Sequence, residues 1–483
     1  MSTDRSIRAW AGRHDQAIFI WIASLILVFL GASLVVIASD DHPMSFLDEH
    51  AHYDTALKMH DGELSYRGAL YEEEVVDEWA CGVGHQAGGL IHGCGDPLLN
   101  VRDVTSGQYT SGYIHYPTYF LGAEAFRAVS TAVFGPQSGL TEYRVFSGLL
   151  VWLGFAVGGV FAYVLGIRRW GLIAAVTLPA AATSIFVMGT MVTPNSTGPL
   201  AGALVAGTGL LWVQRGRGFV WLALASVFAA STAVISSLPV GGFILLIFAA
   251  SIARARGWQF EGAWRPKFWQ ALVLGLIVVA PVIAWGRYIS ATATVSNADV
   301  YGPYQLQGWG RVIRGAIQEL FAFHSPWTEW NLGMPPSGGP VSVALRAAAG
   351  GIPLWVTIAV VGAVVLAVFG VVMKSRGDAG EATGGTGFTA DSSLSTVTRV
   401  RTFRTHQMLA AGTLLTIVLY PAALRVSNAL NFGVEFGIVA RYSMAFAPLL
   451  VLLALILIPQ QRFAIVLAGL GIVGVITTAG VWI

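Results

Sequence analysis

AIFIWIASLILVFLGASLVVIAS, residues 17–39, is an unbroken apolar segment of 23 residues without a charged side chain. A helix needs about 20 mostly apolar residues to cross the hydrocarbon core of a bilayer. The segment therefore predicts a membrane-spanning helix. It lacks the small-residue cleavage site that ends a signal peptide, so we expect it to be retained.

The rest of the chain has the same character. Of its 483 residues 55% are hydrophobic and only 11% are charged, whereas soluble domains usually have about 25% charged residues. The 16 Trp and 57 Gly suit interface anchors and close helix contacts. The net charge of +2 argues against nucleic acid as a partner. This composition excludes an ordinary cytosolic enzyme, a disordered chain and a disulfide-rich secreted scaffold, and it predicts an all-α polytopic membrane protein.

Ten further apolar segments follow the first. The eleven predicted spans are 17–39, 144–167, 170–190, 196–213, 218–236, 238–253, 269–286, 352–373, 407–424, 441–458 and 463–482. Seventeen of the 28 Lys and Arg residues lie on the same side as the N-terminus, mostly in short turns, which places that side in the cytoplasm. The predicted cytoplasmic regions are the N-terminus 1–16 and a flexible loop 374–406, and the long outer regions are 40–143 and 287–351. The second to seventh spans fill residues 144–286, and the ninth to eleventh fill 407–483.

Polar residues concentrate in the first outer segment, which holds 16 of the 26 acidic residues and seven of the ten histidines. A loop this long is expected to fold. Its start, FLDEHAHYDTALKM (46–59), has an apolar stripe that predicts a helix on the membrane surface. Asp48 and Glu49 open this helix, and His52 shares a face with Asp48. The carboxylates form either a structural charge pair or a base at the boundary between water and lipid.

Four other segments contain candidate functional residues. A second interfacial helix is predicted to begin near His115, with Pro117 in its first turn. Asn195 interrupts two apolar segments and either turns the chain or lines a cavity. Arg311 and Arg314 flank an amphipathic helix, where they contact lipid phosphates or serve packing. Arg441, followed by Tyr442, lies at the outer mouth of a span, as does Arg144; such arginines either reach the headgroups or bind a phosphate.

Cys81 and Cys94 are the only cysteines, and 12 residues rich in glycine separate them. On the outer side of a membrane a disulfide is the favoured interpretation. A zinc site completed by His85 and His92 is the alternative, although the spacing matches no common zinc pattern.

The order of short motifs resembles a known family. LDEHAHYD (47–54) follows the first span, HYP (115–117) and YRVFSGLL (143–150) lead into the second, TPNS (193–196) follows the third, and ARY (440–442) opens a late one. This order resembles the GT-C superfamily of membrane glycosyltransferases, and in particular a bacterial branch with an Asp-Glu-x-x-His start. The resemblance extends from the first predicted span to the tenth.

The resemblance implies a polyprenyl-phosphate sugar donor, a glycan or lipid-linked acceptor, and inverting transfer on the outer face of the bacterial plasma membrane. Carried over, Asp48 or its neighbour Glu49 is the catalytic base. Arg441 and Tyr442 bind the donor phosphate, assisted by Arg144 or His115. The expected lining residues are His52, Asn195, Arg311 and Arg314. A divalent cation bridges phosphate and carboxylate in some members, and the sequence does not decide whether one binds here. The sequence departs from the branch where Ser196 follows Asn195, because an Asp is common at that place.

Two other functions compete with this interpretation. A transporter or flippase for lipid-linked glycans would require polar residues deep within several spans, whereas the predicted spans carry almost no charges. A non-catalytic scaffold for envelope assembly would not depend on any polyprenyl-phosphate sugar.

Overall fold

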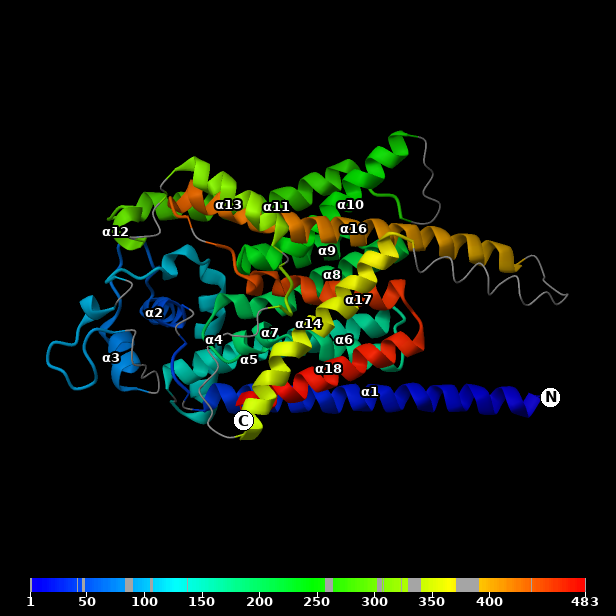
Figure 1. The fold of residues 1–483 in the computed structure, drawn as a ribbon, viewed down its shortest axis with the longest axis horizontal. Helices are drawn as coiled ribbons and strands as arrows, with labels where there is room; N and C mark the ends of the chain where they lie inside the picture. Colours follow the sequence, from blue (N-terminus) through cyan, green and yellow to red (C-terminus); the bar gives the residue numbers. More distant parts are fainter. Residues whose placement is uncertain are drawn as a thin grey trace.

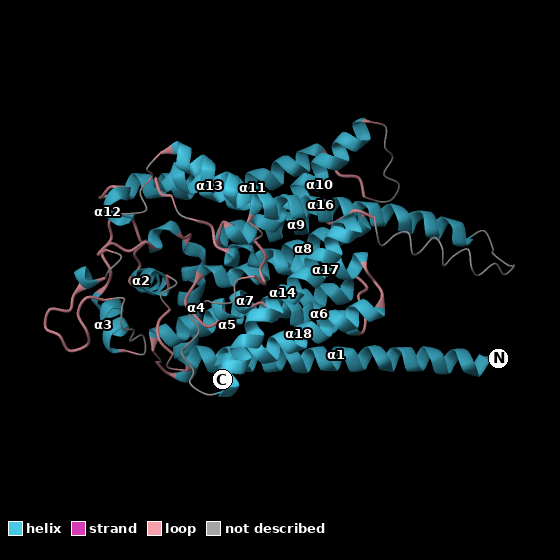
Figure 2. Cartoon of the chain, in the orientation of Figure 1, coloured by secondary structure: helices cyan, strands magenta, loops and turns pink. Residues whose placement is uncertain are grey.

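The chain is almost entirely helical in the computed structural model (Figure 2). The structure describes residues 2–40, 42–45, 48–82, 90–104, 107–136, 138–256, 264–301, 306, 308–322, 324–328, 340–370, 391–435 and 437–482. Within these ranges the β pairing consists of two isolated bridges, Leu70–Tyr109 and Leu90–Val104. The predicted all-α class is therefore confirmed.

Nine helical segments in the described ranges are long and apolar enough to cross a membrane. The helices that form them are α1 (Ser2–Ser39), α5 (Gly139–Val164), α8 (Gly198–Arg215), α10 (Leu238–Ala255), α11 (Phe268–Thr292), α14 (Pro340–Val368), α16 (Asp391–Phe432), α17 (Ala447–Leu457) and α18 (Gln461–Trp482). In the segments of α8, α10 and α17 a 3-10 turn precedes the α-helix and belongs to the same segment. Two more predicted spans correspond to shorter apolar helices, α6 (Trp170–Ala180) and α9 (Phe219–Thr232). The chain is a multi-pass membrane protein, but the predicted count of eleven is not confirmed.

Several boundaries differ from the predicted ones. Helix α14 begins at Pro340 rather than at 352, and α16 already begins at Asp391, inside the predicted cytoplasmic loop. Helix α16 also continues to Phe432, eight residues past the predicted end of its span at 424. Hydropathy marks the apolar part of a helix, whereas its hydrogen bonds continue into polar flanking residues.

The helices form one elongated bundle with a lobe at one end (Figure 1). The lobe contains α2 (Glu49–His60), α3 (Glu73–Cys81) and the start of α4 (Pro117–Phe134). Helix α1 starts far from the lobe and runs along the bundle toward it, and α18 ends on the lobe side (Figure 1). The first and last helices therefore have their free ends at opposite ends of the bundle.

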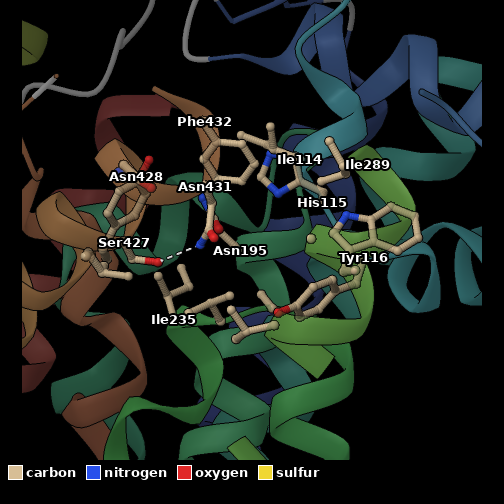
Figure 3. A pocket seen from close by; sticks show the side chains of 17 residues that line it. Ile114, His115, Tyr116, Asn195, Ile235, Ile289, Ser427, Asn428, Asn431 and Phe432 are labelled. Atoms are coloured by element: carbon tan, nitrogen blue, oxygen red, sulfur yellow. Dashed lines mark hydrogen bonds between the residues drawn. The ribbon is translucent and has the colours of Figure 1, made fainter. Parts of the chain in front are cut away.

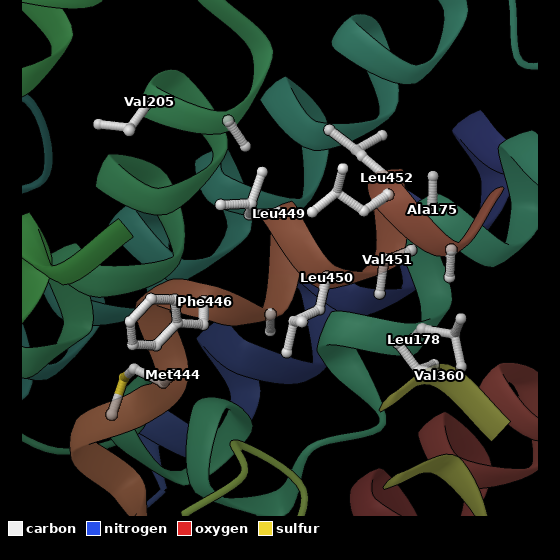
Figure 4. Close-up of a cluster of buried hydrophobic side chains, with 14 of the residues drawn as sticks. Ala175, Leu178, Val205, Val360, Met444, Phe446, Leu449, Leu450, Val451 and Leu452 are labelled. Atoms are coloured by element: carbon white, nitrogen blue, oxygen red, sulfur yellow. The ribbon is translucent and has the colours of Figure 1, made fainter. Parts of the chain in front are cut away.

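Helix α17 is the centre of the bundle. It is apolar along its whole length, and all its residues except one are buried. Leu449 faces the α8 residue Val205, and Leu452 lies beside Ala175 of α6 (Figure 4). Close packing of this kind associates helices in lipid mainly through van der Waals contact. Gly202 permits it here, since a Cβ atom at this position would collide with the backbone of Ala445.

The predicted third span, 170–190, is broken. Helix α6 ends one residue after Pro179, and α7 (Thr183–Met188) begins three residues later. Proline removes a helical hydrogen bond, and a buried helix end needs new partners for its backbone. The segment 324–328 supplies one: the Trp327 indole donates to the carbonyl of Leu178 at 2.8 Å, and Trp327 is fully buried.

The apolar stripe of helix α2 is covered by protein, not exposed as the sequence predicted for a surface helix. Its residues 49–58 are all buried, because α3, α4, α5 and the 3-10 turn η2 (Gly112–Ile114) pack against it. Even Lys58 is buried, where it pairs with Asp54 at 2.6 Å and with Glu72 at 2.9 Å. Burial raises the pKa of Asp54, although the Lys58 ammonium opposes that shift. The apolar stripe is thus the core of a folded lobe.

Candidate active site

The two adjacent carboxylates at the start of α2 have different surroundings. Glu49 is fully buried and pairs with Arg144, whose Nε and Nη2 atoms donate to its two oxygens at 2.8 and 3.1 Å. The same carboxylate accepts from the backbone N–H groups of Ser45 and Val192, at 2.6 and 2.9 Å. Burial raises the pKa of Glu49, but the charge and hydrogen bonds of Arg144 outweigh it and leave the pKa lowered. Glu49 is therefore an anion held on all sides by protein.

Arg144 lies near the start of α5, at the beginning of the second predicted span, and its guanidinium is bound by protein groups. It is 1% exposed and also donates to the carbonyls of His42 and Pro43. In this structure it ties the start of the lobe to α5 through Glu49 and does not line the pocket described below. A guanidinium has five N–H donors and can therefore bind a carboxylate and two carbonyl groups at the same time.

An irregular segment between α7 and α8 (residues 189–193) is completed by the lobe. Besides the Glu49 contact, the carbonyl of Val192 accepts from Nδ1 of His52 at 3.0 Å, and the N–H of Thr193 donates to the Tyr119 hydroxyl at 3.2 Å. These partners satisfy buried backbone groups that no helix satisfies. The lobe therefore fixes the 3-10 turn η3 (Pro194–Thr197), which contains Asn195.

Asp48, unlike Glu49, is exposed and has a different partner. It is the N-cap residue of α2, has a left-handed backbone with φ 67°, and makes no capping hydrogen bond with its side chain. A non-glycine residue in this region costs free energy and is more frequent at functional sites. The carboxylate is 56% exposed and lies 3.7 Å from the guanidinium of Arg441. These two residues are separated by almost 400 positions in the sequence.

Arg441 is the second residue of the 3-10 segment η6 (Ala440–Phe446), which leads into α17. Its side chain is 9% exposed, and its guanidinium lies over the Tyr442 ring at 5.5 Å. Glu319, on α13 (Trp309–Phe321), accepts from the N–H of Ile438 at 3.1 Å. The second outer segment thereby helps to position the turn that carries Arg441.

The buried His52 and the half-buried His115 form a pair with 3.0 Å between their Nε2 atoms. The carbonyl of Val192 can only accept, so Nδ1 of His52 carries a proton. In a neutral ring Nε2 of His52 then accepts, and Nε2 of His115 donates. Burial lowers the pKa of both rings to about 3, so both are neutral at physiological pH. Asp48 is close enough to oppose this shift at His115.

A pocket of about 140 Å³ lies beside this cluster, between the lobe and the bundle. His115 and Tyr116 face Asn195, Ser427 and Asn431 across it (Figure 3). The remaining lining residues are largely apolar or aromatic: Ile114, Ala233, Val234, Ile235, Val282, Trp285, Gly286, Ile289, Leu424, Asn428, Phe432 and Tyr442. The pocket therefore joins three predicted site residues, His115, Asn195 and Tyr442.

The pocket adjoins a more open groove of about 680 Å³ between α11 and α16. Val282, Gly286 and Asn431 line both, and Arg287 and Ser290 line the groove alone. Both helices present apolar side chains outward, such as the exposed Ile283 of α11. The groove thus lies on the side where a surrounding bilayer would be.

Arg311 and Arg314 do not join the site. Both are exposed on α13 and are absent from the pocket lining. The exposed apolar residues Trp309, Ile313, Ile317 and Phe321 follow each other at intervals of four on the same helix, as in an interfacial helix.

Cys81 and Cys94 are joined by a disulfide, which is the favoured one of the two predicted arrangements. Nδ1 of His92 is hydrogen-bonded to the carboxylate of Asp103 at 2.9 Å. His85 lies outside the described residues. Over the described part of the chain, no three His, Cys, Asp or Glu side chains come together in a way that could hold a metal ion.

Sequence reasoning missed Tyr116, Trp285 and the polar end of α16. Ser427 and Asn431 are four residues apart and hydrogen-bonded at 3.1 Å, and Asn428 lines the same pocket. They lie just past the predicted end of the span 407–424. The signal that could have found them is SNALN (427–431), a polar stretch directly after the apolar run of the predicted span.

Comparisons with known proteins give a limited result. No protein-family model and no curated protein matches the chain. Two solved structures are similar to it, both of ArnT from Cupriavidus metallidurans. The apo structure has a TM-score of 0.34 at 14% identity, covering 90% of this chain and 78% of that one. The structure bound to undecaprenyl phosphate has a TM-score of 0.32 at 14% identity, covering 91% and 77%. Similarity this low does not establish a shared activity.

Proposed function

We propose that the chain is a glycosyltransferase that moves a sugar from a polyprenyl-phosphate donor to a cell-envelope acceptor. The observation that carries the proposal is the Asp48–Arg441 pair. It places an exposed carboxylate 3.7 Å from a guanidinium, beside a pocket whose neighbouring groove lies between two membrane-spanning helices. A lipid-borne phosphate, its sugar and a water-soluble acceptor can meet at such a place.

Arg441 is the proposed ligand of the donor phosphate. A guanidinium presents a planar fork of donors that matches phosphate oxygens. The next residue, Tyr442, lines the pocket, so a phosphate at Arg441 would have its sugar within reach of that space. The groove between α11 and α16 is the proposed path of the polyprenyl chain, since its walls include the apolar residues Val282 and Ile283.

Asp48 is the proposed base. The acceptor hydroxyl forms a new bond to the anomeric carbon while the bond from that carbon to the phosphate oxygen breaks. The hydroxyl proton passes to the Asp48 carboxylate, and the lipid phosphate leaves with its negative charge beside Arg441. Direct displacement of this kind inverts the anomeric configuration, and it needs a base and charge stabilisation but no strong acid.

Glu49 is not the proposed base, because Arg144 and two backbone N–H groups already surround its oxygens. Its role is to hold the start of α2 in place, so that its neighbour Asp48 points to Arg441. The two carboxylates that the sequence could not separate thus receive different functions.

We also propose that the lobe lies on the extracytoplasmic side, with the N-terminus in the cytoplasm. The basic residues of the short turns support this orientation, as does the disulfide in the lobe. Labelling single introduced cysteines with an impermeant reagent in intact cells tests it: a cysteine at exposed Asp61 should react, and one at exposed Arg217 should not.

The activity test uses full-length protein in lipid nanodiscs with a panel of polyprenyl-phosphate sugars and a cell-envelope extract as acceptor. We expect release of polyprenyl phosphate by the wild type and a loss of at least 100-fold in Asp48→Asn, the scale of a missing general base. Asp61→Asn, an exposed carboxylate at the end of α2, is the matched control. Unchanged release by Asp48→Asn would remove the proposed base, and movement of intact donor between leaflets without release would indicate a flippase.

A further inference from the structure

The pocket beside Asp48 is neutral. None of the described residues that line it is an Asp, Glu, Lys or Arg, and its one histidine, His115, is uncharged because burial lowers its pKa to about 3. Its polar groups are three amides, hydroxyls and an imidazole, and aromatic rings complete the wall. A charged ligand group would lose its hydration here without gaining a countercharge.

Two of these polar groups are available to a ligand in the pocket. Tyr116 is 7% exposed, and its hydroxyl is buried without a hydrogen-bond partner. Figure 3 shows this hydroxyl directed to the interior of the pocket. A buried hydroxyl left unpaired costs free energy, so its placement indicates a missing partner that is itself polar.

The second group is Nδ1 of His115. The chain of bonds from the Val192 carbonyl through His52 places the single proton of His115 on Nε2. Nδ1 is then a lone pair that can only accept, and no described residue donates to it. A ligand O–H group satisfies this atom, whereas a carboxylate repels it.

We propose that His115 and Tyr116 are the specificity-determining residues of a subsite for a neutral, hydroxylated sugar ring, with His52 as the positioning residue that fixes the His115 tautomer. The inference rests on the proposed function, to which it adds the class of sugar. One sugar hydroxyl donates to Nδ1 of His115, and the Tyr116 hydroxyl pairs with a second sugar oxygen. Sugars that carry a carboxylate or an ammonium group are excluded by the neutral wall.

The tautomer is tested first, by ¹⁵N NMR of the full-length protein labelled at histidine, in nanodiscs. The His115 signals are assigned by their loss in His115→Asn. We expect an unprotonated Nδ1 and a protonated Nε2 at His115, unchanged between pH 8 and pH 5. A proton on Nδ1, or titration within that range, would overturn the assignment. In His52→Gln the side-chain carbonyl can still accept from Nε2, so the His115 tautomer should persist, whereas His52→Leu should release it.

The ligand class is tested with octyl glycosides, whose alkyl chain stands in for the lipid. The probes are octyl β-D-glucoside, octyl β-D-galactoside, octyl β-D-mannoside and, as charged counterparts, octyl β-D-glucuronide and octyl β-D-glucosaminide. At least one neutral probe should shift the His115 Nδ1 resonance, and neither charged probe should. A shift by a charged probe, or by none of the neutral probes, would refute the proposal.

Affinity changes give the second measurement. Tyr116→Phe should lower the affinity for the neutral probe that binds by about 2- to 10-fold, the effect of one hydrogen bond. Tyr163→Phe, at the far end of α5 and 43% exposed, should leave that affinity unchanged. Equal affinity in Tyr116→Phe would remove Tyr116 from the subsite. Asp48→Asn should bind the probe normally and yet release polyprenyl phosphate from the lipid donors at least 100-fold more slowly. A wild type that binds the probe but releases no polyprenyl phosphate from any donor would therefore contradict the proposed function and leave the subsite standing.

Discussion

Replacing Glu49 should destabilise the protein much more than replacing Asp48. Glu49→Gln removes the charge that faces the fully buried Arg144 guanidinium and leaves the amide group facing donors that need an acceptor. Breaking a buried ion pair by changing one partner costs about 3–5 kcal/mol. Each of the two hydrogen bonds between these charges contributes about 1.5–3 kcal/mol, which agrees with that range. We expect a loss of about 4 kcal/mol.

Asp48→Asn is the matched comparison. The Asp48 side chain is 56% exposed, and its 3.7 Å contact with Arg441 is too long for a direct hydrogen bond. Asn also tolerates the left-handed backbone at this position. The expected change in the free energy of unfolding is below about 0.5 kcal/mol, in either direction. One position along the chain should thus separate a stability defect from an activity defect.

The assay is unfolding of the purified protein in mixed micelles by titration with SDS, followed by Trp fluorescence. The double variant Glu49→Gln, Arg144→Met completes a mutant cycle that isolates the coupling between the pair. A coupling near zero, or a Glu49→Gln variant as stable as Asp48→Asn, would refute the role given to Glu49.

Three further predictions concern other parts of the molecule. The pKa of His52 is about 3 in the folded protein and about 6.5 in the unfolded chain, so its contribution to stability is complete above pH 6.5 and declines toward pH 3. At pH 5 the free energy of unfolding should be about 2 kcal/mol lower than at neutral pH. His52→Gln should lose less stability on acidification. The Cys81→Ser, Cys94→Ser variant should lose about 3 kcal/mol by the chain-entropy estimate, measured by the same SDS titration. Gly202→Val should lower transfer at least tenfold by displacing the η6 backbone, whereas Gly275→Ala, with nothing within 4 Å of the added atom, should not.

The helical bundle could be predicted from the sequence because long apolar segments have few alternatives in a membrane. The break after α6 could not, since Pro179 lies within an apolar run and the group that completes the break, Trp327, is 148 residues away. Likewise α2 has the apolar pattern of a surface helix, and only its contacts with the rest of the lobe show that it is buried.

The candidate site could be predicted only in part. The sequence suggested that an acidic residue near 48 would meet Arg441, and the two lie 3.7 Å apart. It could not tell Asp48 from Glu49, because successive helical residues point about 100° apart and the sequence does not state which direction is inward. The pairing of His52 with His115 depends on two turns that are brought together by the fold of the lobe.

Native mass spectrometry of the purified protein tests the central claim most directly. The claim is that Arg441 and Asp48 flank the phosphate of a polyprenyl lipid. We expect the wild type and Asp48→Asn to retain a polyprenyl phosphate or its sugar conjugate when released from nanodiscs made of the native membrane, and Arg441→Gln to lose it. Retention by Arg441→Gln at the level of the wild type, or no such lipid on any of the three proteins, would contradict the account.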